Sequence, residues 1–556
     1  MFLGKVYVPS VHCKGSSGHG RRQSIALALA LFLVGCSSAG NESNFGKLGY
    51  VEGFLGGVVA DEPQAALIGR DMLSAGGSAV DAVVAMYFAA AVTLPSSASL
   101  GGGGVCLAFD SEKGEIRALD FLARPPRRVV PGADRPTAVP GNVRGFYALH
   151  ARYGRLTWSQ VLGPAESLAR FGVRVSRAFA RDLEQVEDAL MVEPETRRVF
   201  AVKDGTRLVR EGDFLRQPEL AAVLSLIRVE LPGKFYGGPL ARKIAASAEE
   251  AGGSLDIEDL RDYKPVWRDT ITLPLGDEVV HFAPPPATGG AVAAEMWAML
   301  ADDDRYEDAS VEERHHLVAE AALRAYADRA RWEDGRGASA VDLQTLVSDP
   351  HIEDMMANYR PDTHVDPAEL GLKVVAGPEN PSAATFVAVD REGSAAACSV
   401  TLNSLFGTGR VASGTGIVLA SLPGQGGRGA RSLGPMMIVN EHVNNFYFVA
   451  AASGGVVAPT AMVDVAARVL LGQQSLEEAL AAKRVYGSGD PDVVFVERGL
   501  SPAASQALVR QGHRIAETPS LGRVDAIYCP GGIPDQKETC AILADPRGFG
   551  LAASAD

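Results

Sequence analysis

The segment from Asn380 to Asn403 constrains the fold of this chain more than any other. It contains two runs with the alternating pattern of a strand, Thr385–Val389 and Ala395–Val400, and a third such run, Phe446–Ala450, follows later in the chain. Long amphipathic patterns typical of helices dominate residues 160–260 and 310–360. Strands and helices distributed in this way are compatible with sheets that are covered by layers of helices.

Length and charge limit the possible classes of protein and partner. At 556 residues the chain is long enough for two or three domains. Its formal net charge of −14 argues against nucleic acid and acidic membrane surfaces as partners. Beyond the N-terminus no run reaches the roughly 18 apolar residues of a membrane-spanning helix. The shorter apolar run Ala82–Leu94 predicts a buried helix.

The N-terminus has the composition of an export signal. A basic stretch, His19–Gln23, precedes an apolar run, Ser24–Val34, as in bacterial signal peptides. The run ends in Leu33-Val34-Gly35-Cys36, which resembles the lipobox of bacterial lipoproteins. On this interpretation residues 1–35 are removed, Cys36 is lipidated, residues 36–50 form a flexible tether, and the protein is anchored in the bacterial cell envelope facing the periplasm. A plain secretory signal cut nearby is the alternative.

The remaining cysteines of the mature chain form two groups. Cys106 and Cys398 lie in apolar, strand-like runs, where inert buried thiols are expected. Cys529 and Cys540 bracket a Pro-Gly-Gly-Ile-Pro loop, and in an exported chain this spacing fits either a disulfide or two free thiols.

Several motifs occur in the order and spacing of one known family. The chain resembles the γ-glutamyltransferases in Gly76–Ala85, Leu100–Val105, Ala138–Gly145, Gly253–Tyr263, Pro284–Gly290 and Glu320–Arg329. The resemblance implies the N-terminal-nucleophile hydrolase fold, an α/β fold built as a four-layer αββα sandwich. It implies transfer or hydrolysis of γ-glutamyl groups from glutathione and related compounds, without a cofactor. A large-subunit-like region, residues 51–382, and a small-subunit-like region, residues 383–556, would together form one domain.

Alanine occupies the position of the family's nucleophile. Phe386–Asp390 matches the strand that follows the nucleophilic threonine, and Asn403 stays in step with it without a gap, which places Ala383 at the threonine position. In the family this threonine cuts the chain before itself and then attacks the substrate with its hydroxyl. Because alanine has no hydroxyl, the resemblance implies an uncut and catalytically deficient chain.

Three further positions depart from the family pattern. Leu122 stands where an arginine binds the α-carboxylate of the substrate, and Gln425 stands where an aspartate binds its amine. The lid loop is shortened, and the family's paired serines appear as Arg431 and Ser432.

Other parts of the family site are retained. Thr401 and Asn403 keep the family's T-x-N pattern. Gly454 and Gly455 match the glycines whose N–H groups form the family's oxyanion hole.

Neighbouring residues are candidates for replacing the lost groups. Ser382 lies one residue early, which turns its side chain to the opposite face of a strand, whereas Thr385 has the right face but lies two positions further in. Arg124 is a candidate for the missing arginine, but we expect it to join Arg127 and Arg128 on a solvated face.

His315, His316 and Glu320 have the residue types of a metal site. Adjacent histidines on a helix point away from each other, and the charged residues around them indicate that they face solvent, so no metal site is expected here.

The sequence therefore predicts an exported, lipid-anchored γ-glutamyltransferase homologue that has lost its chemistry. Its ligand would be a small γ-glutamyl compound or a peptide. The alternative is an active, divergent amidohydrolase of the same fold that uses Ser382 or Thr385 as nucleophile.

Overall fold

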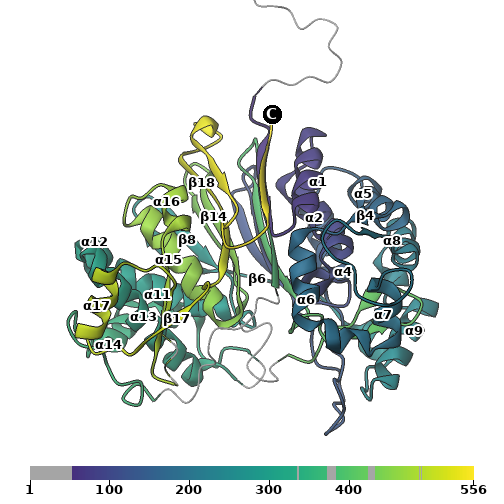
Figure 1. Cartoon of the computed structure of the whole chain (residues 1–556). Coiled ribbons are helices and arrows are strands. Elements are labelled where there is room, and N and C mark those ends of the chain that lie inside the picture. The colour runs from purple at the N-terminus through teal and green to yellow at the C-terminus, as the bar shows by residue number, and fades with distance from the viewer. Residues whose placement is uncertain (1–52, 335–336, 372–382, 424–431, 488, 490) are drawn as a thin grey trace, which may run out of the picture. The chain divides into compact units, whose positions relative to one another are not determined.

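Two antiparallel sheets form the centre of the protein (Figure 1). The structure, a computed structural model, describes residues 53–334, 337–371, 383–423, 432–487, 489 and 491–556. In order across the first sheet, the strands are β20 (Leu551–Ala555), β1 (Gly56–Ala60), β9 (Ala383–Asp390), β10 (Ala395–Thr401), β2 (Gly103–Asp110), β3 (Glu115–Phe121) and β6 (Val266–Arg268). In order across the second sheet, they are β19 (Ala541–Leu543), β18 (Arg523–Ile533), β14 (Asn445–Ser453), β13 (Met436–Asn440), β8 (Glu278–Phe282) and β7 (Ile271–Leu275).

The side chains of β9 alternate between its two faces, and both faces are apolar. Val387 and Val389 point into a cluster shared by the two sheets, while Phe386 and Ala388 point into the cluster between the first sheet and its helices. Every residue of β9 is buried, which its nearly uninterrupted apolar composition permits. The strands expected over Thr385–Val389, Ala395–Val400 and Phe446–Ala450 are confirmed as parts of β9, β10 and β14.

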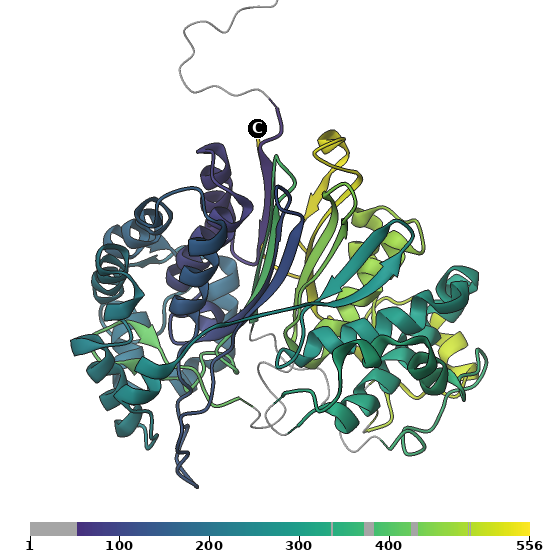
Figure 2. The ribbon, with the colours of Figure 1, turned by 180° about the vertical axis from the view of Figure 1, so that it is seen from behind.

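Helices cover the outer face of each sheet (Figure 2). Those on the first sheet include α1 (Pro63–Ser74), α2 (Ala79–Thr93), α4 (Asn142–Tyr153), α5 (Trp158–Phe171) and α8 (Pro218–Glu230). Those on the second include α11 (Thr288–Ala301), α13 (Val311–Trp332), α15 (Ala458–Leu470) and α17 (Pro502–Arg510). The arrangement is the αββα layering of an N-terminal-nucleophile hydrolase.

Helix α2 shows why such layers form. Ser78 and Asp81 make a reciprocal capping box at its N-terminus, and all of its residues are buried between the sheet and the surrounding helices. The buried helix expected over Ala82–Leu94 is thereby confirmed, with an end at Thr93. None of the described helices is long and apolar enough to cross a membrane.

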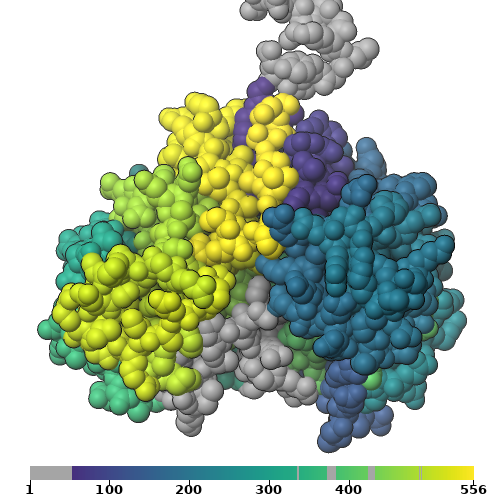
Figure 3. Space-filling view, in the orientation of Figure 1, coloured from purple at the N-terminus to yellow at the C-terminus, as the bar shows by residue number. Residues whose placement is uncertain are grey.

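Segments that are far apart in sequence alternate within the first sheet. Strands β9 and β10 lie between β1 and β2, so the 51–382 and 383–556 regions share one sheet and one core. At the edge, β20 pairs with β1, and the C-terminal residues lie beside the N-terminal strand in the space-filling view (Figure 3). Neither region can bury its strands without the other.

The cysteines differ from expectation at one pair. Cys106 and Cys398 are not free thiols: they oppose each other across β2 and β10 and form a disulfide. The two cysteines are 292 residues apart in sequence, so the disulfide could not be predicted without the strand register that brings them together. Cys529 and Cys540 also form a disulfide, which settles the alternative that the sequence had left open.

Candidate functional site

Ala383, which the sequence predicts at the family's nucleophile position, is the first residue of β9. Ala383 is in register with Thr401 of β10, which is in turn in register with Gly103 of β2. Ala383 is 5% exposed, and its methyl group belongs to the apolar cluster between the sheets. Leu122 and Leu433 belong to the same cluster. Ala383 thus lies between this apolar cluster and Thr401, and its own side chain offers no hydroxyl for nucleophilic attack.

The arginine position is filled by a buried leucine. Leu122 is 4% exposed, and its carbonyl oxygen accepts a hydrogen bond of 2.9 Å from the hydroxyl of Tyr263. Nearby, Arg124 forms an ion pair of 3.1 Å with Asp120 and lies over the ring of Tyr263. The Arg124 side chain is 37% exposed, as on a solvated face, although its guanidinium group is held by this carboxylate and ring. Because Arg124 is already paired with Asp120, it is a poor replacement for the arginine that binds the α-carboxylate of the substrate in the family.

The retained T-x-N pattern builds a turn after β10. The backbone N–H of Asn403 donates to the Thr401 hydroxyl oxygen at 2.9 Å, and the Asn403 amide donates to the carbonyl of Ser421 at 2.9 Å. Asn403 adopts a left-handed conformation with φ of 66°, which asparagine tolerates better than most residues. In the described structure these two residues fix the backbone beside residue 383.

Gly454 and Gly455 form a left-handed turn at the end of β14. Their φ angles are +137° and +65°, and a Cβ on Gly454 would lie 2.6 Å from the Cα of Gly522. Glycine is required here by both conformation and space. The turn leads into the N-terminus of α15, where the helix dipole favours negative charge.

The lid region is partly described. Ser432 is half-buried, and its backbone packs closely on Gly289 at the start of α11: a Cβ at Gly289 would lie 2.6 Å from the Ser432 carbonyl carbon. This contact explains the glycines of the Pro284–Gly290 motif. Ser382, Gln425 and Cys36 lie outside the described residues.

Thr385 belongs to a buried polar network that the sequence did not reveal. Its hydroxyl oxygen lies 3.0 Å from Asp61 Oδ2 and 2.7 Å from Asp525 Oδ2, and its side chain is almost fully buried. Burial, together with the charge of Asp61, holds the pKa of the Asp525 carboxyl well above its ordinary value. A protonated Asp525 supplies the second hydrogen that two carboxylates around one hydroxyl require.

The network is neutralised by an arginine. Arg523 pairs with Asp61 at 3.2 Å and donates to the hydroxyl of Ser453 at 3.0 and 3.1 Å. Asp61 precedes α1, Arg523 and Asp525 lie on β18, and Thr385 lies on β9. The network thus ties the two sheets together where they face each other.

The histidines of α13 differ from expectation. His315 and His316 do not face solvent: they are 7% and 0% exposed, because α13 is covered by α17 and by the segment around Arg360. Two groups of side chains in this part of the protein have the residue types and spacing to hold a metal ion: His316, Glu320 and His513, and Glu295, Asp328 and His351.

Comparison with known proteins identifies the family. The model of the family described as gamma-glutamyltranspeptidase matches residues 65–425 and 420–555. The chain belongs to the γ-glutamyltranspeptidase family. These matches extend over nearly all of the described structure, including every strand of both sheets except β1.

Individual relatives agree with this assignment. The chain is 29% identical over 518 residues to the glutathione hydrolase proenzyme of Escherichia coli (strain K12), covering 85% of this chain and 88% of that protein. It is 27% identical over 523 residues to the acylase ACY 1 proenzyme of Pseudomonas sp. (strain SE83), covering 86% and 91%. The crystal structure of cephalosporin acylase from Bacillus halodurans superposes with a TM-score of 0.76 at 24% identity, over 90% of this chain and 96% of that one, which supports the fold.

The buried environment of Thr385 leads to a prediction about its role. Replacing Thr385 by valine leaves the Asp61 and Asp525 carboxyl groups without their shared hydroxyl, so we expect the free energy of unfolding to fall by about 1–3 kcal/mol. Thr385→Ser keeps the hydroxyl and should stay within about 1 kcal/mol of the parent. Denaturant unfolding of the three proteins measures the difference. Equal stability of Thr385→Val and the parent would show that the network does not depend on this hydroxyl.

Proposed function

We propose that this γ-glutamyltranspeptidase-family protein is catalytically deficient and acts as a binding or scaffold protein. The observation that carries the proposal is Ala383, whose methyl group lies in an apolar cluster at the start of β9. Without a hydroxyl this residue cannot form a covalent intermediate or cut the chain. Loss of a nucleophile alone typically costs on the order of 10⁶ in rate.

The groups that would hold a γ-glutamyl substrate are changed as well. Leu122 offers no charge to an α-carboxylate, and Gln425 offers none to an amine. An arginine–carboxylate pair is a strong, charge-assisted contact of about 1.5–3 kcal/mol. The nucleophile, the two charged groups that bind the substrate and the lid loop are thus all altered. We propose that the ligand is a small γ-glutamyl compound or peptide that is bound without being transformed.

The competing function is an active amidohydrolase with a displaced nucleophile. The similarity to an acylase proenzyme makes amide substrates other than glutathione a reasonable class for it. Thr385 is poorly suited to the task, because its hydroxyl is buried between two carboxyl groups and paired with both. Ser382 remains the candidate that this alternative requires.

The first prediction of this proposal is that the mature chain does not cut itself near residue 383. The gel that tests this has to be run under reducing conditions, because the Cys106–Cys398 disulfide would otherwise hold two fragments together. We expect one band at the mass of the intact mature chain, with and without reductant. Two reduced fragments, the smaller beginning at Ser382, Ala383 or Thr385 by N-terminal sequencing, would support the active alternative.

The second prediction is that Ala383→Thr alone does not restore normal γ-glutamyl transfer. Two missing charged contacts should keep the rate on the order of 10²–10⁴-fold below that of a complete site. Release from a γ-glutamyl chromogenic substrate measures this, with Ala384→Thr, which faces the helix layer, as the matched control. Adding Leu122→Arg and Gln425→Asp should raise the rate of the Ala383→Thr variant. Strong release by the single variant would show that these two positions matter little.

We further propose that the protein is exported and anchored to a membrane by lipid on Cys36. The basic stretch, the apolar run and Leu33-Val34-Gly35-Cys36 support this location. Several acyl chains on one cysteine anchor a protein stably, whereas a single chain binds only marginally.

The third prediction tests the anchor. Cys36→Ala should move the protein from the membrane fraction to the soluble fraction, or block removal of the signal, because the acylated residue is lost. Cys13→Ala is the matched control and should behave like the parent, since Cys13 lies in the segment that is removed. A Cys36→Ala protein that fractionates and migrates like the parent would leave a plain secretory signal as the explanation.

A further inference from the structure

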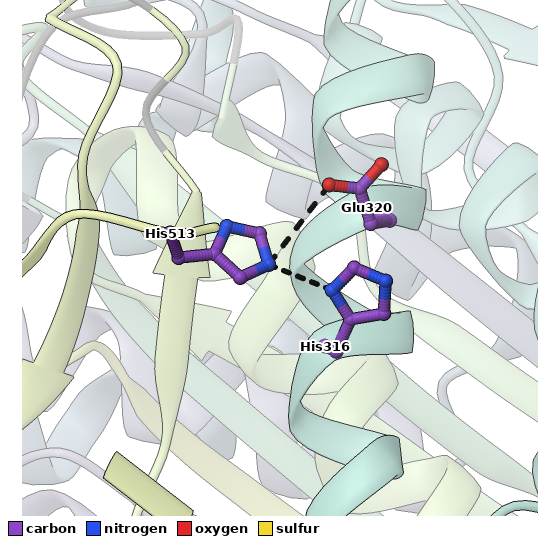
Figure 4. Close-up of side chains that lie close together, drawn as sticks. All are labelled: His316, Glu320 and His513. Atoms are coloured by element: carbon purple, nitrogen blue, oxygen red, sulfur yellow. Dashed lines mark hydrogen bonds and ion pairs between the residues drawn. The ribbon is translucent and has the colours of Figure 1, made fainter. Parts of the chain in front are cut away.

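Three buried side chains converge in the helix layer that covers the second sheet (Figure 4). His316 and Glu320 lie one turn apart on α13, and His513 lies just before β17 (Ile515–Thr518). The Nδ1 atom of His316 is 2.7 Å from Nε2 of His513, which is 4.0 Å from Oε1 of Glu320. One ligand atom from each residue lies within 4.8 Å of the other two. All three side chains are buried.

The ring nitrogens that face each other can offer lone pairs. His316 Nε2 lies 2.9 Å from the carbonyl oxygen of Arg360, which can only accept, so this nitrogen carries the hydrogen and Nδ1 is left with a lone pair. His513 Nδ1 has no hydrogen-bond partner among the described residues. The His513 proton can therefore move from Nε2 to Nδ1 without breaking a hydrogen bond at Nδ1, which frees the Nε2 lone pair.

A second set of contacts orients the carboxylate. Arg324 donates to Oε2 of Glu320, and His364 Nδ1 lies 2.6 Å from Oε1. His364 is itself held by Asp492, with Nε2 at 3.0 Å from Oδ1. Carboxylate and imidazole ligands of metal ions are typically oriented by such outer hydrogen bonds.

We propose that His316 Nδ1, His513 Nε2 and Glu320 Oε1 bind a divalent transition-metal ion, with zinc as the best fit. Two imidazoles and one carboxylate are a ligand set that zinc accepts, and the i, i+4 spacing on α13 places two of them on one face of the helix. Tetrahedral ligands at about 2.0–2.2 Å from one ion lie roughly 3.3–3.5 Å apart, so on binding the two histidine nitrogens would separate from 2.7 Å and Glu320 Oε1 would approach His513 Nε2 from 4.0 Å. Coordination would replace the histidine–histidine hydrogen bond.

The site would act as a cross-link within this layer. It joins α13 to a segment 197 residues later in the chain. The alternative use of these side chains is a metal-free hydrogen-bond network. A measurement of bound metal distinguishes the metal site from the metal-free network. The proposal does not depend on whether Ala383 replaces a nucleophile.

The experiment measures zinc in the mature chain, purified without chelator or polyhistidine tag and equilibrated with zinc before dialysis. We expect about one zinc per chain by mass spectrometry, and about tenfold less in His513→Gln, which removes one ligand but keeps a polar side chain. His442→Gln, in an exposed turn, is the matched control and should keep the zinc. A parent at background, or equal zinc in both variants, overturns the proposal.

A second measurement uses the unaltered chain, in case His513→Gln fails to fold. Titration with Co²⁺ should give the intense visible absorption of a low-coordinate cobalt site with nitrogen ligands, and Zn²⁺ should then displace it. Only the weak spectrum of hydrated Co²⁺ would mean that the three side chains form a metal-free network.

Discussion

The apolar layer between the two sheets is the constraint on which the rest of the structure depends. β9, β10 and β2 contribute one side of this layer, and β13, β14 and β18 contribute the other. Because side chains alternate along a strand, each strand that supplies this layer must supply a helix-covered layer with its remaining residues. Residue 383 follows the same alternation: it points into the layer between the sheets because Val387 and Val389 on the same strand do.

The polar network at Thr385 interrupts that apolar layer, and its cost in desolvation has to be offset by pairing. Asp61, Asp525 and Arg523 are all almost fully buried; Arg523 pairs with Asp61, and the protonated carboxyl group of Asp525 bonds to the Thr385 hydroxyl. Removing one partner from such a group typically destabilises more than the pair itself contributes. The network therefore stabilises the strands on either side of Thr385.

The helix layer on the second sheet contains a cluster of buried histidines, in contrast to the carboxyl groups of the Thr385 network. Histidines from α13, from the segment after Arg360 and from the turn before β17 meet beneath the surface, and their hydrogen bonds connect elements that are distant in sequence. These hydrogen bonds offset the cost of burying the polar groups, although Nδ1 of His513 has no partner among the described residues. The layer is thus specified by polar contacts as well as by apolar packing.

The sequence by itself determined the family, the layered fold, the main strands and the buried helix α2, because motifs and alternation are local properties of the chain. It did not determine which residues meet across strands and layers. The Cys106–Cys398 disulfide depends on the register of β2 and β10, and the contact of Arg124 with Asp120 and Tyr263 depends on how the chain folds back beside β3. The burial of His316 and its contact with His513 also depend on packing between distant segments. Such contacts are decided by the tertiary structure, since a side chain's neighbours are set by the register and packing of the whole domain.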